Sequence, residues 1–220
     1  MINLLEPTQI IKSKRKSISL VIKSNGEFIV RAPIKSSDAS IVKFIKEKSN
    51  WVIKKRTESI VSAVSPFEFN GLDKMKILDK TYIVECGQIT RVFIDKNKII
   101  VPNADPKTHL ISFLKKTAKK YIAERVKLIS SLFNFTYNSI SITSAKTCWG
   151  SCGFNNKLHF SYRLIMCPTD VVDYVVLHEL CHTQVKNHSN KFWQLVASCN
   201  PYYKNHEKWL KKNRAIMDLI

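Results

Sequence analysis

The sequence predicts an α+β fold: a small mixed or antiparallel sheet packed on one apolar helix, preceded by a β-hairpin-rich N-terminal part. Two observations support this prediction. Alternating apolar and polar residues, typical of half-buried strands, recur through the first hundred residues and again before residue 166. An apolar segment with helical spacing then runs to residue 182. We expect residues 1–103 to form a β-rich region with one amphipathic helix, and residues 104–220 to form a second region as one compact unit.

The composition is typical of a folded, soluble protein. The chain has 220 residues, of which 45% are hydrophobic, enough for a buried core. No run approaches the roughly eighteen apolar residues of a membrane-spanning helix, and the N-terminus lacks the pattern of a secretory signal. We therefore expect a cytoplasmic protein without membrane contact, with its six cysteines reduced. The net charge of +19 favours contact with nucleic acid or acidic proteins, although a solvated lysine-rich surface explains it equally well.

The first elements in order are a hairpin and a helix. Residues 17–31 alternate apolar and polar side chains on both sides of Asn25-Gly26, a pair that suits a tight type I′ turn. Residues 36–56 place apolar side chains at helical spacing and lysines between them. This pattern predicts one amphipathic helix with a basic face.

A second set of strands and a long helix follow. Residues 61–73 lose periodicity and predict a loop. Three strand-like runs, 75–85, 89–95 and 98–102, come next, the last two as a hairpin turning near Lys96-Asn97. Asp105-Pro106 then predicts a helix start, because proline at the first helical position loses no needed hydrogen bond, and an apolar stripe continues to residue 133.

The C-terminal elements place a motif on a helix. Residues 139–144 and 157–165 read as strands. Cys167-Pro168 then opens a helix whose first turn holds Asp170, where a carboxylate is favoured by the helix dipole. The stretch "VVLHELCHTQVKNHSNKFW", residues 175–193, lies on this helix and beyond it.

This stretch has the spacing of a metal site. His178 and His182 are four residues apart, so a helix places both imidazoles on one face, where they can bind one zinc ion. Glu179 can then reach a zinc-bound water and act as a general base. The pattern predicts a zinc-dependent hydrolase, because burying these three polar groups without a metal is costly. A degenerate or purely structural metal site is the alternative.

A catalytic zinc ordinarily has three protein ligands. His188 is our choice for the third, because it lies in the turn between the metal-binding helix and the next one, which Ser189 can cap. Glu207, and its neighbour His206, are rivals from a later helix. Cys148 and Cys152 could be half of a second metal site, but no matching pair follows.

Several segments together resemble one family. They are "WGSC" at 149–152, "YRLI" at 162–165, "VVDYVVLHELCH" at 171–182, "NHSNKFW" at 187–193 and the late "PYYKNHEKWLKKN". They are similar to the YgjP-like metallopeptidases, zincins related to the SprT and WLM proteases. The resemblance implies a zincin-like fold, a zinc cofactor held by His178, His182 and His188, and Glu179 as the catalytic residue.

We therefore expect a zinc metallopeptidase with a protein or peptide substrate. A strand before the metal-binding helix, 139–144 or 157–165, would pair with the substrate as an added strand. Five residues could contact substrate or its oxyanion and cannot be ranked from the sequence: Tyr162, Arg163, Tyr174, Tyr202 and His206. The alternative is a basic nucleic-acid-associated protein with a structural or degenerate zinc site, or a protease acting on nucleic-acid-bound proteins.

Overall fold

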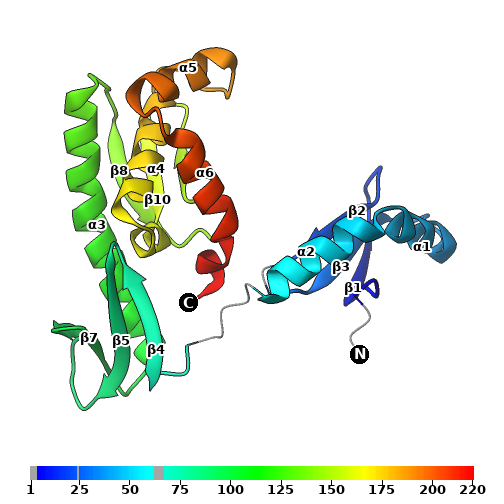
Figure 1. Ribbon diagram of the computed structural model, residues 1–220, viewed down its shortest axis with the longest axis horizontal. Helices are drawn as coiled ribbons and strands as arrows, with labels where there is room; N and C mark the ends of the chain where they lie inside the picture. Colours follow the sequence, from blue (N-terminus) through cyan, green and yellow to red (C-terminus); the bar gives the residue numbers. More distant parts are fainter. Residues whose placement is uncertain (1–3, 24, 62–66) are drawn as a thin grey trace. The chain divides into compact units, whose positions relative to one another are not determined.

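The structure is a computed structural model that describes residues 4–23, 25–61 and 67–220. The chain divides by its internal contacts into two compact units, one made largely of Met1–Ser65 and the other of Pro66–Asp218. Each unit combines helices with small sheets, so the predicted α+β class is confirmed (Figure 1). The sequence placed a boundary at residue 103, between a β-rich region and the region that holds the motif. This boundary stays a prediction, since the division by internal contacts describes packing and not the roles of the two regions.

The N-terminal unit is a three-stranded sheet with two helices. Strands β1 (Gln9–Ser13), β2 (Ser19–Ile22) and β3 (Phe28–Pro33) lie in the order β1-β3-β2. The predicted hairpin is confirmed, because β2 and β3 pair antiparallel and Gly26 in the turn has a φ of 82°. Strand β1, which pairs parallel to β3, was not predicted.

The predicted single helix over 36–56 is wrong, because two helices replace it. Helix α1 (Asp38–Glu47) is followed by its C-cap residue Lys48, and α2 (Ser49–Val61) begins directly after Lys48. Ile41, Ile45 and Val52 are all buried in one cluster with side chains of β3. The interruption thus allows both helices to bury apolar side chains in the same core.

The second unit begins with a four-stranded sheet in the order β4-β5-β7-β6. Its strands are β4 (Asn70–Ile77), β5 (Lys80–Gly87), β6 (Phe93–Asp95) and β7 (Lys98–Pro102). The predicted hairpin at Lys96-Asn97 is confirmed, with β6 and β7 antiparallel, but its first strand, predicted over 89–95, is limited to β6. The predicted loop over 61–73 lies partly outside the described residues, and β4 already begins at Asn70. The run 75–85 is two strands, because the chain turns at Leu78, whose φ is 56°.

A long helix and a second sheet lead to the motif. Helix α3 (Pro106–Leu132) begins as predicted, with the Asp105 side chain accepting from the Thr108 N–H. Strands β8 (Ser139–Thr143), β9 (Gly150–Cys152) and β10 (Lys157–Ser161) form a sheet in the order β8-β10-β9. Strand β9 was not predicted. The predicted strand over 157–165 is too long, because residues Tyr162–Met166 form a buried 3₁₀ helix, η1.

Four helical elements complete the unit: α4 (Thr169–Cys181), α5 (Asn190–Cys199), α6 (Tyr203–Lys212) and the 3₁₀ helix η2 (Arg214–Asp218). Helix α4 is central, since it contacts α3, β9, α5 and α6 (Figure 1). A two-pronged ion pair fixes it to α3: Arg125 Nε and Nη2 donate to the Asp173 carboxylate at 2.6 and 2.7 Å. Within the described ranges, no helix is long and apolar enough to cross a membrane.

Candidate metal centre

Helix α4 positions the first two histidines of the motif. The helix starts at Thr169, directly after the N-cap residue Pro168, and the Asp79 carboxylate accepts hydrogen bonds from the Thr169 N–H at 3.3 Å and from its hydroxyl at 2.6 Å. The helix is buried along most of its length. His178 lies in its last turn and His182 caps its end, so their rings lie 4.9 Å apart between centroids.

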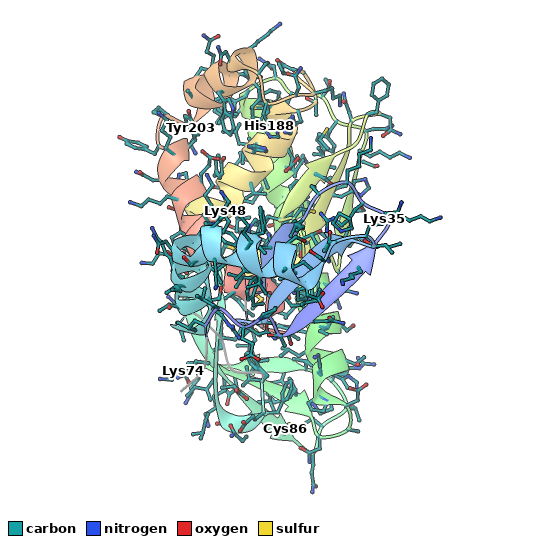
Figure 2. The ribbon with its side chains drawn as sticks, turned by 90° about the vertical axis from the view of Figure 1, so that its right-hand side faces the viewer. Lys35, Lys48, Lys74, Cys86, His188 and Tyr203 are labelled. Atoms are coloured by element: carbon teal, nitrogen blue, oxygen red, sulfur yellow. The ribbon has the colours of Figure 1, made fainter. Side chains whose placement is uncertain are left out.

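The chain reverses after α4 and brings His188 back to these rings. Val185 donates its N–H to the Cys181 carbonyl, which continues the helical path for one more turn. Lys186 then binds the β9–β10 turn, where its Nζ donates to the Gly153 carbonyl at 3.0 Å and the Asn156 side chain at 2.5 Å. His188 follows two residues later, beside the C-terminal part of α4 (Figure 2).

Three imidazole nitrogens converge. The Nε2 atom of His188 lies 3.1 Å from the Nε2 atoms of both His178 and His182. Two nitrogens bound at about 2.0–2.1 Å to a tetrahedral zinc lie about 3.3–3.4 Å apart. The spacing therefore fits a metal ion held by all three nitrogens, and these residues form the metal-compatible cluster found among the described residues.

Contacts behind the two helix histidines set the orientation of their rings. The Nδ1 atom of His182 lies 2.9 Å from the Val185 carbonyl oxygen, so it donates its proton there and leaves Nε2 with a free lone pair. The Nδ1 atom of His178 lies 3.5 Å from the Tyr174 hydroxyl. Burial and the two neighbouring imidazoles lower the pKa of His178 to about 3, which favours the neutral form that binds metals.

Glu179 is buried beside the cluster and faces strand β9. It is 6% exposed, and the part of the chain that the structure describes offers its carboxylate no hydrogen bond. Burial raises the pKa of this carboxyl to about 8. Gly150 leaves the room for it, because a Cβ on Gly150 would lie 2.8 Å from the Glu179 Cγ and 2.9 Å from its Oε1.

The remaining predicted residues lie in different places. Tyr174 contacts the cluster, with its ring 5.9 Å from that of His178. Tyr162 and Arg163 lie on η1 instead, where the Arg163 guanidinium packs over the Tyr162 ring and donates to the Ser144 carbonyl and to a main-chain oxygen of Ile220. No hydrogen bond or ring contact joins either residue to the three histidines in the described ranges.

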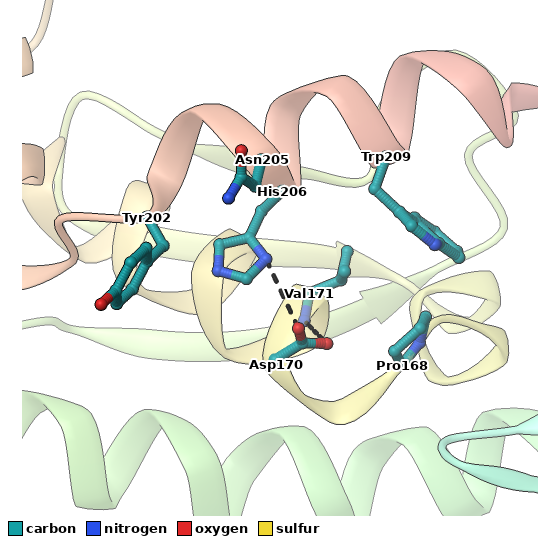
Figure 3. Close-up of a pocket in the computed structure, with 7 residues that line it drawn as sticks. All are labelled: Pro168, Asp170, Val171, Tyr202, Asn205, His206 and Trp209. Atoms are coloured by element: carbon teal, nitrogen blue, oxygen red, sulfur yellow. Dashed lines mark hydrogen bonds and ion pairs between the residues drawn. The ribbon is translucent and has the colours of Figure 1, made fainter.

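The rival ligands lie on or next to α6, outside the histidine cluster. Glu207 pairs with Lys211 at 3.9 Å between Oε1 and Nζ. His206 stacks on Tyr174 with ring centroids 5.5 Å apart, and Tyr202 lines the same hollow as His206 (Figure 3). Cys148 is exposed and Cys152 lies near Lys186, and no second metal-compatible group is found among the described residues.

Sequence reasoning missed three contributors to the site. The Val185 carbonyl leaves no trace in the sequence, because any residue carries that group. Gly150 was noted only within the segment 149–152, because its closeness to Glu179 arises from packing and not from any local pattern. Phe192 stacks on His182 with ring centroids 4.2 Å apart.

Comparison with known proteins gives one family. The model of the YgjP-like metallopeptidase domain matches residues 16–213. No curated protein matches the chain. Two solved structures show similarity: the metallopeptidase zymogen abylysin of Pyrococcus abyssi and the metallopeptidase zymogen jannalysin of Methanocaldococcus jannaschii. The first is 16% identical with a TM-score of 0.38, covering 41% of this chain and 93% of the other. The second is 21% identical with a TM-score of 0.37, covering 41% and 94%.

Proposed function

Because the chain belongs to the YgjP-like family of metallopeptidases, we propose that it hydrolyses peptide bonds at the His178, His182 and His188 cluster with zinc as the metal. The convergence of the three Nε2 atoms, with Glu179 beside them, is the observation that carries this proposal. Neutral imidazoles at this spacing are a donor set that zinc accepts. The proposed arrangement is zincin-like, with the motif helix packed against the sheet of β8, β9 and β10.

Each residue of the centre has one proposed task. The three histidines hold the metal, and bound zinc supplies a Lewis acid that lowers the pKa of water and polarises a carbonyl. Glu179 takes a proton from the attacking water and returns it to the leaving amine. Its buried position supports this role, since burial raises the pKa of a carboxyl towards neutrality and makes proton uptake easier.

The free edge of β9 is the proposed place for the substrate backbone. Of the two strands that the sequence offered, β10 lies between β8 and β9 and has no open edge, and β8 lies at the opposite edge of the sheet from β9, where it contacts α3. Strand β9 pairs with β10 on one side only and contacts α4 on the side of Glu179. An extended peptide added to β9 would pass beside the base without requiring a particular sequence.

Tyr174 receives a positioning role in this proposal. Of the five candidates for contact with substrate or oxyanion, it is the one with a polar atom near a cluster histidine, 3.5 Å from the His178 Nδ1 atom. An oxygen at that position can accept a hydrogen bond from the Nδ1–H group. The His178 Nε2 atom then keeps a free lone pair for the metal. We assign Tyr162 and Arg163 to the packing of η1, where both are buried.

The test is peptide cleavage by the zinc-loaded wild type and by Glu179→Gln. The variant keeps the size of the side chain and removes the base, so we expect cleavage to fall by about 10² to 10⁴ with the zinc content unchanged. His159→Ala, which removes a histidine outside the cluster, serves as the control and should retain activity. Equal cleavage by Glu179→Gln and the wild type would exclude the proposed base.

A further inference from the structure

A hollow lies between the start of α4 and the start of α6, away from the histidine cluster. Its volume is about 550 Å³, and its walls include Asp170 and Pro168 from one side and Tyr202, His206 and Trp209 from the other (Figure 3). None of these residues has a part in the proposed hydrolysis. The hollow is thus large enough to hold one side chain of a peptide substrate.

The hollow is connected to the proposed centre along one face of α4. Asp170, Tyr174 and His178 are spaced by four residues, which places them in one row on a helix. His206 of the hollow stacks on Tyr174, and Tyr174 in turn contacts His178. Eight residues of helix span about 12 Å, the length of about three to four residues of extended peptide. A substrate cleaved at the cluster could therefore reach the hollow with a side chain a few positions away.

The hollow offers a carboxylate without a strong cationic partner. The Asp170 side chain is 66% exposed, and within the described part of the chain its Oδ1 accepts from the neighbouring Val171 N–H alone, at 2.8 Å. Its Oδ2 lies 3.7 Å from the His206 Nδ1, beyond hydrogen-bond distance. No lysine or arginine pairs with Asp170 among the described residues, although the chain has 36 of them.

Aromatic walls complete a site suited to a cation. The rings of Trp209 and Tyr202 lie on either side of Asp170 and His206 (Figure 3). A carboxylate attracts an ammonium or guanidinium group, indole and phenol rings attract it by cation–π interaction, and Pro168 gives the alkyl stem an apolar surface. We propose that this hollow is a subsite that selects a lysine or arginine side chain of the peptide substrate, an inference that rests on the proposed peptidase function.

The test compares two peptide series that differ in one charge. Each series carries one lysine, or one norleucine of nearly the same shape, at successive positions on both sides of the cleaved bond. Cleavage is measured as kcat/KM, and binding of the same labelled peptides is measured by fluorescence anisotropy at fixed ionic strength. We expect the wild type to prefer lysine over norleucine at one position by about threefold to tenfold, the range of one ordinary hydrogen bond, because the exposed Asp170 carboxylate is screened by solvent.

Asp170→Asn should abolish or reverse this preference, because the net charge of +19 then repels the lysine peptide without a local carboxylate to offset it. Asp79→Asn is the matched control: it removes a carboxylate that binds Thr169 at the start of the same helix, outside the hollow, and should keep the preference. Asp170→Lys should turn the preference towards glutamate at the same position.

The two measurements separate this inference from the function on which it rests. A wild type that cleaves lysine and norleucine peptides equally at every position would overturn the subsite and leave the peptidase intact. A persisting lysine preference in Asp170→Asn would do the same. If the wild type cleaves nothing but binds lysine peptides in an Asp170-dependent way, the subsite stands and the proposed hydrolysis fails.

Discussion

Glu179 links burial and chemistry most directly at the scale of single residues. Its carboxyl is 6% exposed, and burial raises its pKa to about 8 from an ordinary value of 4.5. Between these two pH values the folded chain without metal keeps a proton that the unfolded chain has lost. Stability from this group is thus complete below pH 4.5 and declines as the pH rises towards 8.

This shift predicts a pH-dependent difference between two chelator-treated proteins. Glutamine cannot ionise, so Glu179→Gln should be more stable than the wild type, with a difference in the free energy of unfolding that grows from pH 4.5 to pH 8. Urea unfolding of both proteins at several pH values measures it. The low pKa of His178 acts in the opposite direction below pH 6.5 in both proteins and cancels in the comparison. If the difference in the free energy of unfolding does not change with pH, burial does not raise the pKa of Glu179 in the folded protein.

The close approach of Gly150 to Glu179 gives the second prediction for a single residue. An added Cβ would lie 2.8 Å from the Glu179 Cγ, closer than real Cβ atoms approach. We expect Gly150→Ala to displace the Glu179 carboxylate, lower kcat more than it changes KM, and destabilise the protein by about 1–3 kcal/mol. Gly153→Ala is the matched control, since its nearest contact would be 3.4 Å and ordinary.

The double variant Gly150→Ala/Glu179→Ala identifies the cause. If the clash with Glu179 is responsible, removing that side chain should recover much of the stability lost in Gly150→Ala. If the stability change of the double variant equals the sum of the changes in the two single variants, the loss in Gly150→Ala does not come from a clash with Glu179.

At the scale of elements, the connection between α4 and α5 determines where His188 lies. Lys186 attaches this connection to the β9–β10 turn through the Gly153 carbonyl and the Asn156 side chain. The attachment lies two residues before His188, so its loss should give that imidazole more freedom in the zinc-free protein. Ordering the imidazole on metal binding then becomes less favourable.

We therefore expect Lys186→Met to weaken zinc binding by about tenfold, measured by competition with a chromophoric chelator. Lys191→Met removes the same charge from an exposed position at the start of α5 and should leave zinc binding unchanged. Equal zinc affinities for Lys186→Met and the wild type would show that α4 and α5 alone place His188.

The elements also show which parts of the structure a sequence can predict. The β2–β3 hairpin, α3 and α4 carry their signals within a few residues, as turn pairs, caps and periodicity. Strand β1 was missed because its parallel partner β3 lies beyond β2, so the pairing is not local. Strand β9 has three residues, too few for a pattern, and η1 resembles the end of a strand because all five of its residues are buried. The apolar side chains of α1 and α2 keep the same helical spacing on both sides of Lys48, so the sequence predicts one helix there.

The same rule of locality separates the site residues. His178, His182 and His188 fall within eleven residues, so helical geometry and one turn were enough to predict their approach. Gly150 meets Glu179 only through the packing of β9 on α4, which no spacing in the sequence encodes. Tyr162 and Arg163 were two of the unranked candidates for contact with substrate, whereas the 3₁₀ turn directs them to other partners.

At the scale of the whole molecule, the net charge of +19 acts on every substrate. A positive field raises the association rate of acidic ligands and is screened by salt. We expect kcat/KM for a peptide with acidic flanks to fall several-fold between about 0.05 and 0.5 M salt, and that of a neutral peptide to change less. A parallel response of the two peptides would show that the charge has no part in substrate capture.

The basic charge also supports the alternative that the protein is associated with nucleic acid, and this alternative stays a prediction. A nucleic-acid-associated protein would bind DNA or RNA with an affinity that falls steeply with salt, and Glu179→Gln would retain its biological function. The peptidase account instead requires cleavage of free peptides without added nucleic acid.

Metal content is the measurement that tests the three-histidine zinc centre most directly. We predict about one zinc per wild-type chain, retained in Glu207→Ala and lost or strongly reduced in His188→Ala, because among the described residues only His188 brings a nitrogen to both helix histidines. Elemental analysis of the three purified proteins, after dialysis against the same zinc buffer, gives the answer. Wild-type protein without zinc, or zinc that depends on Glu207 and persists without His188, would contradict the account.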